Sequence, residues 1–248
     1  MATNQETGHA KNVATFESLI SAINGYGAGY NPSKQSITVS SMTALAQNAS
    51  NYLSHVNNAS GNNSIAIAGR TVVFKTLSSM STRILNALRA SDTTKQIDNA
   101  AQALVRKIQG QRATPKLSAE EKAALAAEGT VKKEVSSSQM SFDNRIENFD
   151  KLIQLLTGIP QYAPNEIELQ LSSLTAYCNS LRAANSAALA ADTQLSNARL
   201  SRNEVLYKEN TGLVDIATAA KMYLKSLFGA TSPQYKQVSG LAFKSLPL

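Results

Sequence analysis

The sequence predicts an all-α fold: an elongated antiparallel helical bundle built from two tandem helical-hairpin repeats with long heptad-patterned helices. One observation is an internal repeat, because the segment Phe16–Ile20 returns in similar form as Phe149–Ile153. Another is a heptad pattern of apolar residues within each copy. The third is composition: 43% of the residues are hydrophobic, but only 6% are aromatic and none is Trp. Such a composition is typical of helices that approach closely through small side chains.

The order of polar and apolar segments predicts the domain organisation. We expect a flexible N-terminal tail at residues 1–10 and a first helical repeat at residues 11–108. A polar connector at residues 109–141 follows, with a short helix that starts at a capping box, Ser118–Glu121. The second helical repeat occupies residues 142–248.

Each copy begins with a short helix and a turn. In the first copy, apolar residues at 3/4 spacing predict a helix over residues 12–24, and Gly25 ends it. The long helix is expected to start at Pro32, because proline is tolerated in the first turn of a helix. Pro164 is the equivalent residue in the second copy.

The long helix of each copy carries the heptad pattern, which we call the seam. In the second copy the seam consists of Leu174, Tyr177, Leu181, Ala184, Ala188, Ala191, Leu195, Ala198, Arg202 and Val205. The first copy has nearly the same seam 132 residues earlier, from Met42 to Val73. Glycine and asparagine disfavour helix, so we expect a kink or a frayed turn at Ser60–Asn63, rather than a domain boundary.

The copies diverge after the seam. In the second copy a turn at Gly212 precedes a third helix from Leu213 to Phe228. In the first copy no helix breaker separates Phe74 from Arg89, so we expect one continuous helix there.

Two arginines occupy equivalent seam positions where an apolar residue is expected. Arg70 and Arg202 are candidates for structural ion pairs, because a buried guanidinium needs a carboxylate. Glu17 and Asp150 are the candidate partners, since they too hold equivalent positions in the two copies. The alternative is that each arginine is exposed at the edge of the seam.

Three tyrosines near the expected turns are candidate interaction-loop residues: Tyr26, Tyr30 and Tyr162. Tyrosines at the tip of a bundle can form a contact surface. The alternative is that they pack the turn against the bundle.

The sequence predicts no catalytic, cofactor-binding or metal-binding residues, and it favours a protein that is not an enzyme. The one cysteine, Cys178, excludes an internal disulfide framework, and we expect it to be buried. The two histidines, His9 and His55, match no metal-ligand spacing.

The net charge of +7 is concentrated in the first copy. Residues 1–113 contain ten Lys or Arg and four Asp or Glu. This basic character would suit an anionic partner, although a solvated basic face explains it equally well. The sequence has neither a secretory signal nor an apolar run long enough for a transmembrane segment. We therefore expect a cytoplasmic protein, with non-classical release as an alternative.

Several segments carry a resemblance to a known family. The chain resembles a family of uncharacterised bacterial proteins of the Bacteroidetes type. In the second copy the resemblance is carried by Ser141–Ile153, Tyr162–Asn165, Arg202–Lys208 and Ser232–Val238, and in the first copy by Gly25–Gly27, Tyr30–Ser33 and Lys107–Gly110. The resemblance implies a duplicated all-helical protein and carries no activity.

The leading functional hypothesis is a structural protein. A duplicated unit with long alanine-rich seams suits a scaffold that self-assembles into an oligomer or filament. One alternative is an elongated helical membrane-interacting protein, similar to pore-forming toxins. Another is a basic module that binds nucleic acid or an acidic partner.

Overall fold

The computed structural model describes residues 5–111, 127 and 140–244, and these residues form helices joined by turns, with no strands. The all-α prediction is therefore confirmed for the described residues. The expected capping box at Ser118–Glu121 lies outside them. The elements are α1 (Gln5–Asn24), η1 (Gly27–Gly29), η2 (Gln35–Ile37), α2 (Val39–Lys75), α3 (Leu77–Arg89), α4 (Lys95–Gln109), α6 (Phe142–Thr157), η3 (Ile167–Leu169), α7 (Leu171–Tyr207), α8 (Leu213–Phe228) and α9 (Pro233–Ser239).

The chain divides into two compact units. Unit 1 contains residues 1–64 and 191–248, and unit 2 contains residues 65–190. The division falls inside α2 and inside α7, so it differs from the expected division into residues 11–108 and 142–248. The reason is that the first helix of each copy packs on the last helices of the other copy: α1 on α8 and α9, and α6 on α4.

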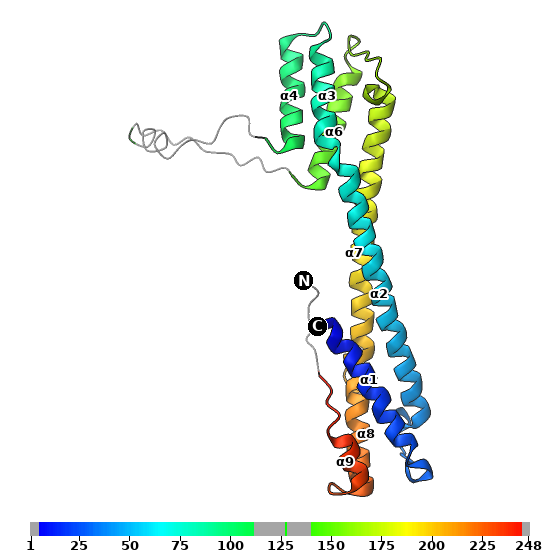
Figure 1. The fold of residues 1–248 in the computed structure, drawn as a ribbon. Coiled ribbons are helices and arrows are strands. Elements are labelled where there is room, and N and C mark those ends of the chain that lie inside the picture. The colour runs from blue at the N-terminus through cyan, green and yellow to red at the C-terminus, as the bar shows by residue number, and fades with distance from the viewer. Residues whose placement is uncertain (1–4, 112–126, 128–139, 245–248) are drawn as a thin grey trace. The chain divides into compact units, whose positions relative to one another are not determined.

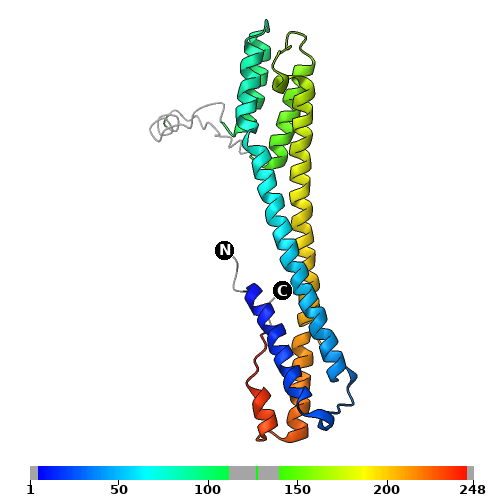
Figure 2. The same ribbon diagram turned by 45° about the vertical axis from the view of Figure 1, so that its right-hand side comes forward.

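Unit 1 has a core shared by α1, the first part of α2, the end of α7, α8 and α9. Figures 1 and 2 show α1, α8 and α9 side by side. Phe16 and Leu19 of α1 and Leu213 of α8 are completely buried there. Burial of this one apolar face explains why α1 is a stable helix.

Unit 2 has a separate core. α4 packs against both α3 and α6, and these three helices lie together in both views (Figures 1 and 2). The core is formed by buried residues of these helices and of the adjoining parts of α2 and α7, including Phe149, Leu152 and Leu174. Tyr177 of α7 reaches α2 by donating a hydrogen bond to the Val73 carbonyl, 2.8 Å away.

The two long helices have the same length. α2 and α7 each contain 37 residues, and they start 132 residues apart in the sequence. Every seam position in both helices is buried or half-buried. α2 is continuous through Ser60–Asn63, so the expected frayed turn does not occur in this stretch. Helix propensity is a weak preference, and half-burial of the seam residues Ala59 and Asn63 outweighs it.

Three expected helix boundaries are wrong. The long helices start at Val39 and Leu171, because the segments after Pro32 and Pro164 first form the short 3-10 turns η2 and η3. α2 ends at Lys75 and a new helix starts at Leu77, so no continuous helix joins Phe74 to Arg89.

The expected tail at residues 1–10 is wrong for residues 5–10, because α1 already begins at Gln5, and residues 1–4 lie outside the described residues. His9 is buried in this first part of the helix, where it contacts the end of α7. A buried contact of this kind holds a segment that its polar composition alone would leave loose. By contrast, the predicted third helix at Leu213–Phe228 is confirmed as α8.

One glycine explains how the chain leaves α4. Gly110 has a φ of 70°, in the left-handed region, and Gln111 donates its amide to the Arg106 carbonyl 2.8 Å away. This is the Schellman arrangement that ends many helices. The left-handed φ favours glycine at this position, and a Cβ atom there would lie 2.4 Å from the sulfur of the flexible Met140 side chain, which would have to move.

Candidate functional site

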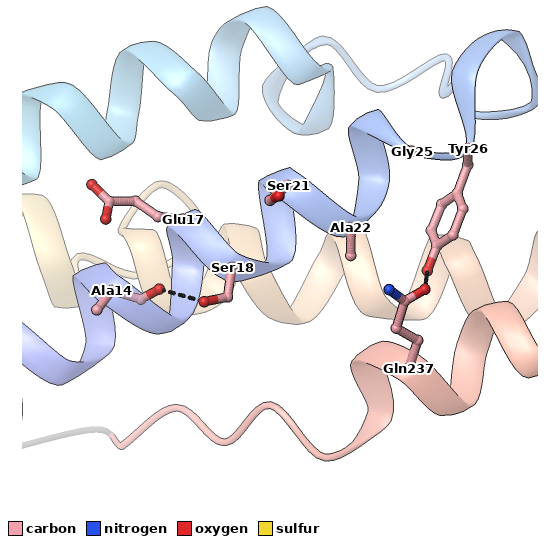
Figure 3. Close-up of a pocket in the computed structure, with 8 residues that line it drawn as sticks. All are labelled: Ala14, Glu17, Ser18, Ser21, Ala22, Gly25, Tyr26 and Gln237. Atoms are coloured by element: carbon pink, nitrogen blue, oxygen red, sulfur yellow. Dashed lines mark hydrogen bonds between the residues drawn. The ribbon is translucent and has the colours of Figure 1, made fainter.

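A surface groove of about 830 Å³ lies in unit 1 between α1 and α9 (Figure 3). It is lined by Ala14, Glu17, Ser18, Ser21, Ala22, Gly25, Tyr26 and Gln237. Glu17 is the one charged residue in this lining, and the Ser18 hydroxyl already donates to the Ala14 carbonyl 2.9 Å away. The groove is a polar recess, and no side chain that lines it is hydrogen-bonded to a general base such as a histidine.

Tyr26 closes one end of this groove. Its hydroxyl lies 2.9 Å from the Gln234 carbonyl and 3.0 Å from Oε1 of Gln237, both in α9. Its ring meets the Phe228 ring edge to face, with 5.4 Å between centroids. Burial raises the pKa of the Tyr26 hydroxyl. Tyr26, proposed as an interaction-loop residue, therefore holds α1 to α9 within unit 1.

Tyr30 and Tyr162 are internal rather than exposed. Their exposed fractions are 7% and 5%. Tyr30 donates its hydroxyl to the Ile37 carbonyl at 2.7 Å, and Tyr162 donates to the Leu169 carbonyl at 2.9 Å. Burial, as the main cause, raises the pKa of each hydroxyl to about 12. The hypothesis of an exposed contact surface is wrong for these two tyrosines, and the packing alternative describes them.

Each of these hydrogen bonds closes the turn that leads into a long helix. The donor precedes its acceptor by seven residues in both copies. The acceptor carbonyl belongs to the last residue of the 3-10 turn η2 or η3. The tyrosine thus pairs a buried carbonyl that precedes the hydrogen-bonded ladder of the helix.

Arg70 of α2 is half-buried in unit 2 and has polar and aromatic partners. Its Nη1 donates to Oδ1 of Asn185 at 3.1 Å, and its guanidinium carbon lies 4.0 Å from the centre of the Phe142 ring. Asn185 in turn donates to Oδ1 of Asp143 at 2.8 Å. The cation is therefore held by a ring face and by an amide that links it to an acid of α6.

Arg202 of α7 belongs to unit 1 and is only 3% exposed. Its Nε and Nη2 atoms donate to Oδ1 of Asn203 at 3.0 and 2.9 Å. The alternative of an exposed arginine at the seam edge is therefore wrong for Arg202.

The expected acid partners lie elsewhere. Asp150 pairs with Arg182, with 2.9 Å between Oδ1 and Nη2, and Glu17 is exposed in the surface groove. Within the described residues, neither acid contacts Arg70 or Arg202. Arg70 lies at the level of Phe142, whereas Asp150 is eight residues further along α6, or about 12 Å at 1.5 Å per residue.

A buried polar cluster in unit 1 was missed by the sequence reasoning. The Tyr207 hydroxyl lies 2.7 Å from Nδ1 of His9 and accepts a hydrogen bond from Nδ2 of Asn12 at 3.2 Å. Asn12 also binds the backbone of Lys244, donating to its carbonyl at 2.8 Å and accepting from its amide at 3.0 Å. The cluster joins three segments: α1, the end of α7 and the chain after α9. Polar residues at buried positions of an apolar helix face were the available signal.

Cys178 is buried in unit 2, as expected, with an exposed fraction of 1%. Burial is the main cause that raises the pKa of its thiol, and the neighbouring Asp150 carboxylate acts in the same direction. The thiol therefore stays protonated near neutral pH, which is the opposite of an activated nucleophile.

The described residues include no cluster of three or more His, Cys, Asp or Glu arranged to hold a metal ion. Among the described helices, none is both long and apolar enough to cross a membrane. Comparisons with known proteins give no match to a family model, a curated protein or a solved structure. The resemblance to a bacterial family stays a prediction.

Proposed function

We propose that the chain is a non-enzymatic helical scaffold protein, built from two duplicated helical hairpins, that self-assembles into an oligomer or filament. The observation that carries the proposal is the equivalent construction of the two copies. Each has a 37-residue helix, and each has a tyrosine that closes the turn before it. Two similar copies in one chain present similar surfaces twice, and this allows head-to-tail association.

The buried polar groups support a structural role. Tyr30 and Tyr162 bind backbone carbonyls, and Asn12 binds the backbone on both sides of Lys244. These side chains hold segments of the chain in place. Such contacts fix one arrangement of helices more than they prepare groups for a reaction.

Light scattering after size-exclusion chromatography tests the proposal, with electron microscopy of the same fractions. Oligomers or regular filaments of the purified chain are the expected result. A monomer at every concentration up to the millimolar range would overturn it.

Net charge favours a second candidate, a binding module for an anionic partner. Unit 1 contains nine Lys or Arg and six Asp or Glu, and unit 2 contains 15 and 11. The positive charge is therefore shared by both units, although the sequence concentrates it in the first copy. A complex with nucleic acid that weakens steeply with added salt would support this candidate.

A further inference from the structure

α2 presents an apolar face within unit 2 that no described residue of the unit covers. Ile65 and Val72 are 73% and 69% exposed, and the exposed residues Ala68 and Gly69 lie between them. The spacing of three, four and seven residues places all four on one side of the helix, and we call them the α2 face. A large apolar side chain in water is ordinary when it is single, but a row on one helix face indicates a contact surface.

The second copy provides an internal comparison. The residues of α7 equivalent to Ile65 and Val72, 132 positions later, are Asn197 and Glu204, and both are exposed. The same helical positions are therefore compatible with polar side chains. The apolar character of the α2 face is a property of α2, and the architecture of the long helix does not require it.

Gly69 adds a second observation. A Cβ atom at Gly69 would meet no atom of the described residues within 4 Å, so no contact among those residues explains this glycine. Glycine inside a helix costs about 1 kcal/mol relative to alanine. The equivalent residue in α7 is Ser201. A flat site between Ile65 and Val72 would instead let the backbone of a partner helix approach closely.

The charge pattern indicates what the partner is. The four residues of the α2 face carry no charge, whereas the whole chain has a net charge of +7. Arg70 points to Asn185 and Phe142 inside unit 2, and the nearest cation on the side of the face is Lys75, three residues after Val72. Nucleic acid would select a surface rich in Lys and Arg. A second copy carries the same +7, so two copies meet with least repulsion through an uncharged surface. Depletion of charge is also typical of the centre of protein interfaces.

We propose that the α2 face is the self-association surface of this chain, and that its occupant is the α2 face of a second copy. This inference rests on the proposed self-assembly and names the interface of a closed dimer, which is distinct from the head-to-tail contact that a filament would need. The contact is isologous, with the two helices packed about a twofold axis near Gly69. One helix face is smaller than the roughly 800 Å² per partner of a standard interface, so the association is weak and depends on concentration.

The test compares the full chain with the double variant Ile65→Asn/Val72→Glu, which introduces the residues that α7 has at the same positions. Leu200→Glu is the matched control, because Leu200 is a 61% exposed apolar residue of α7. Circular dichroism checks that all three proteins fold equally. Sedimentation equilibrium then measures the dissociation constant, which we expect to rise about tenfold or more in the double variant and to stay unchanged in Leu200→Glu.

Disulfide cross-linking locates the contact independently. Ala68→Cys should form a covalent dimer on mild oxidation, whereas Leu200→Cys, at the equivalent position of α7, should not. Native Cys178 is buried and should not take part.

The outcomes separate the two proposals. Self-association that persists in the double variant would overturn the proposal that the α2 face is the interface, and it would leave the proposed scaffold function unaffected. A monomeric wild-type chain would overturn both. A further outcome is that the wild type binds lipid vesicles through this face without self-associating, whereas the double variant does not bind them. That result would show that a membrane covers the α2 face, and it would overturn the proposal that a second copy does.

Discussion

The tyrosine hydrogen bonds that close the two turns allow a quantitative test. Replacing Tyr162 by Phe keeps the ring and removes the hydroxyl that donates to the Leu169 carbonyl at 2.9 Å. Among the described residues, no other group donates a hydrogen bond to that carbonyl, and Leu169 is only 5% exposed. A buried carbonyl left unpaired costs about 1–3 kcal/mol. Tyr30→Phe should have a similar effect in the other unit, and the two effects should add because they share no partner.

The same hydroxyls predict how stability depends on pH. In the folded chain burial raises the pKa of Tyr30 and Tyr162 to about 12, against the ordinary value of 10.0 for an exposed tyrosine. As the pH rises above 10, the unfolded chain therefore loses these protons before the folded chain does. Their contribution to stability is complete below pH 10 and is lost as the pH approaches 12. At pH 11 the loss is about 1 kcal/mol for each tyrosine.

Thermal and urea unfolding followed by circular dichroism at pH 8 and pH 11 measures both effects. The variant Tyr30→Phe/Tyr162→Phe should be less stable than wild type at pH 8 and should lose less stability on going to pH 11. Tyr52→Phe is the control, because no hydrogen bond is described for the Tyr52 hydroxyl. An unchanged unfolding free energy in the double variant at pH 8, or an equal alkaline loss in both proteins, would refute the reasoning.

Three other predictions concern single side chains. Phe149→Ala should lower the unfolding free energy by about 3–5 kcal/mol in urea titrations, because Phe149 is completely buried in the core of unit 2; a loss below 1 kcal/mol would contradict that core. Asn12→Ala should speed hydrogen exchange of the Lys244 amide, since Asn12 accepts its hydrogen bond; unchanged exchange would exclude this contact in solution. Cys178 should react with a thiol reagent only after unfolding, because burial both shields it and raises its pKa; rapid reaction of the native chain would show the opposite.

Local periodicity was enough to predict the helices and their buried sides. Seam positions from Met42 to Val73 and from Leu174 to Val205 are buried or half-buried throughout. The heptad pattern predicts this because residues three and four apart share one side of a helix. The start of each long helix was mispredicted, because the segments that follow Pro32 and Pro164 form the 3-10 turns Gln35–Ile37 and Ile167–Leu169 before the α-helix begins.

Contacts between distant segments were not predictable from local patterns. The two copies have arginines at equivalent positions, Arg70 and Arg202, and acids at equivalent positions, Glu17 and Asp150. This equivalence suggested ion pairs, but it does not show which residues lie opposite one another on neighbouring helices. In the structure Asp150 forms an ion pair with Arg182. Arg70 is connected to Asp143 through hydrogen bonds of Asn185. Likewise, the pairing of each copy's first helix with the other copy's last helices depends on the tertiary fold alone.

The division of the chain into a continuous and a discontinuous unit has a consequence for synthesis. Unit 2 is a single stretch, residues 65–190, whereas unit 1 needs residues 191–248 to join residues 1–64. On the ribosome, all of unit 2 is made before α8 and α9, two of the helices that pack on α1, exist. Translation proceeds at about 5–20 residues per second. The apolar side of α1 therefore remains without α8 and α9 for several seconds after unit 2 is complete. During this interval the nascent chain carries one finished unit and one exposed helix, and it is then that a chaperone would have the most to protect.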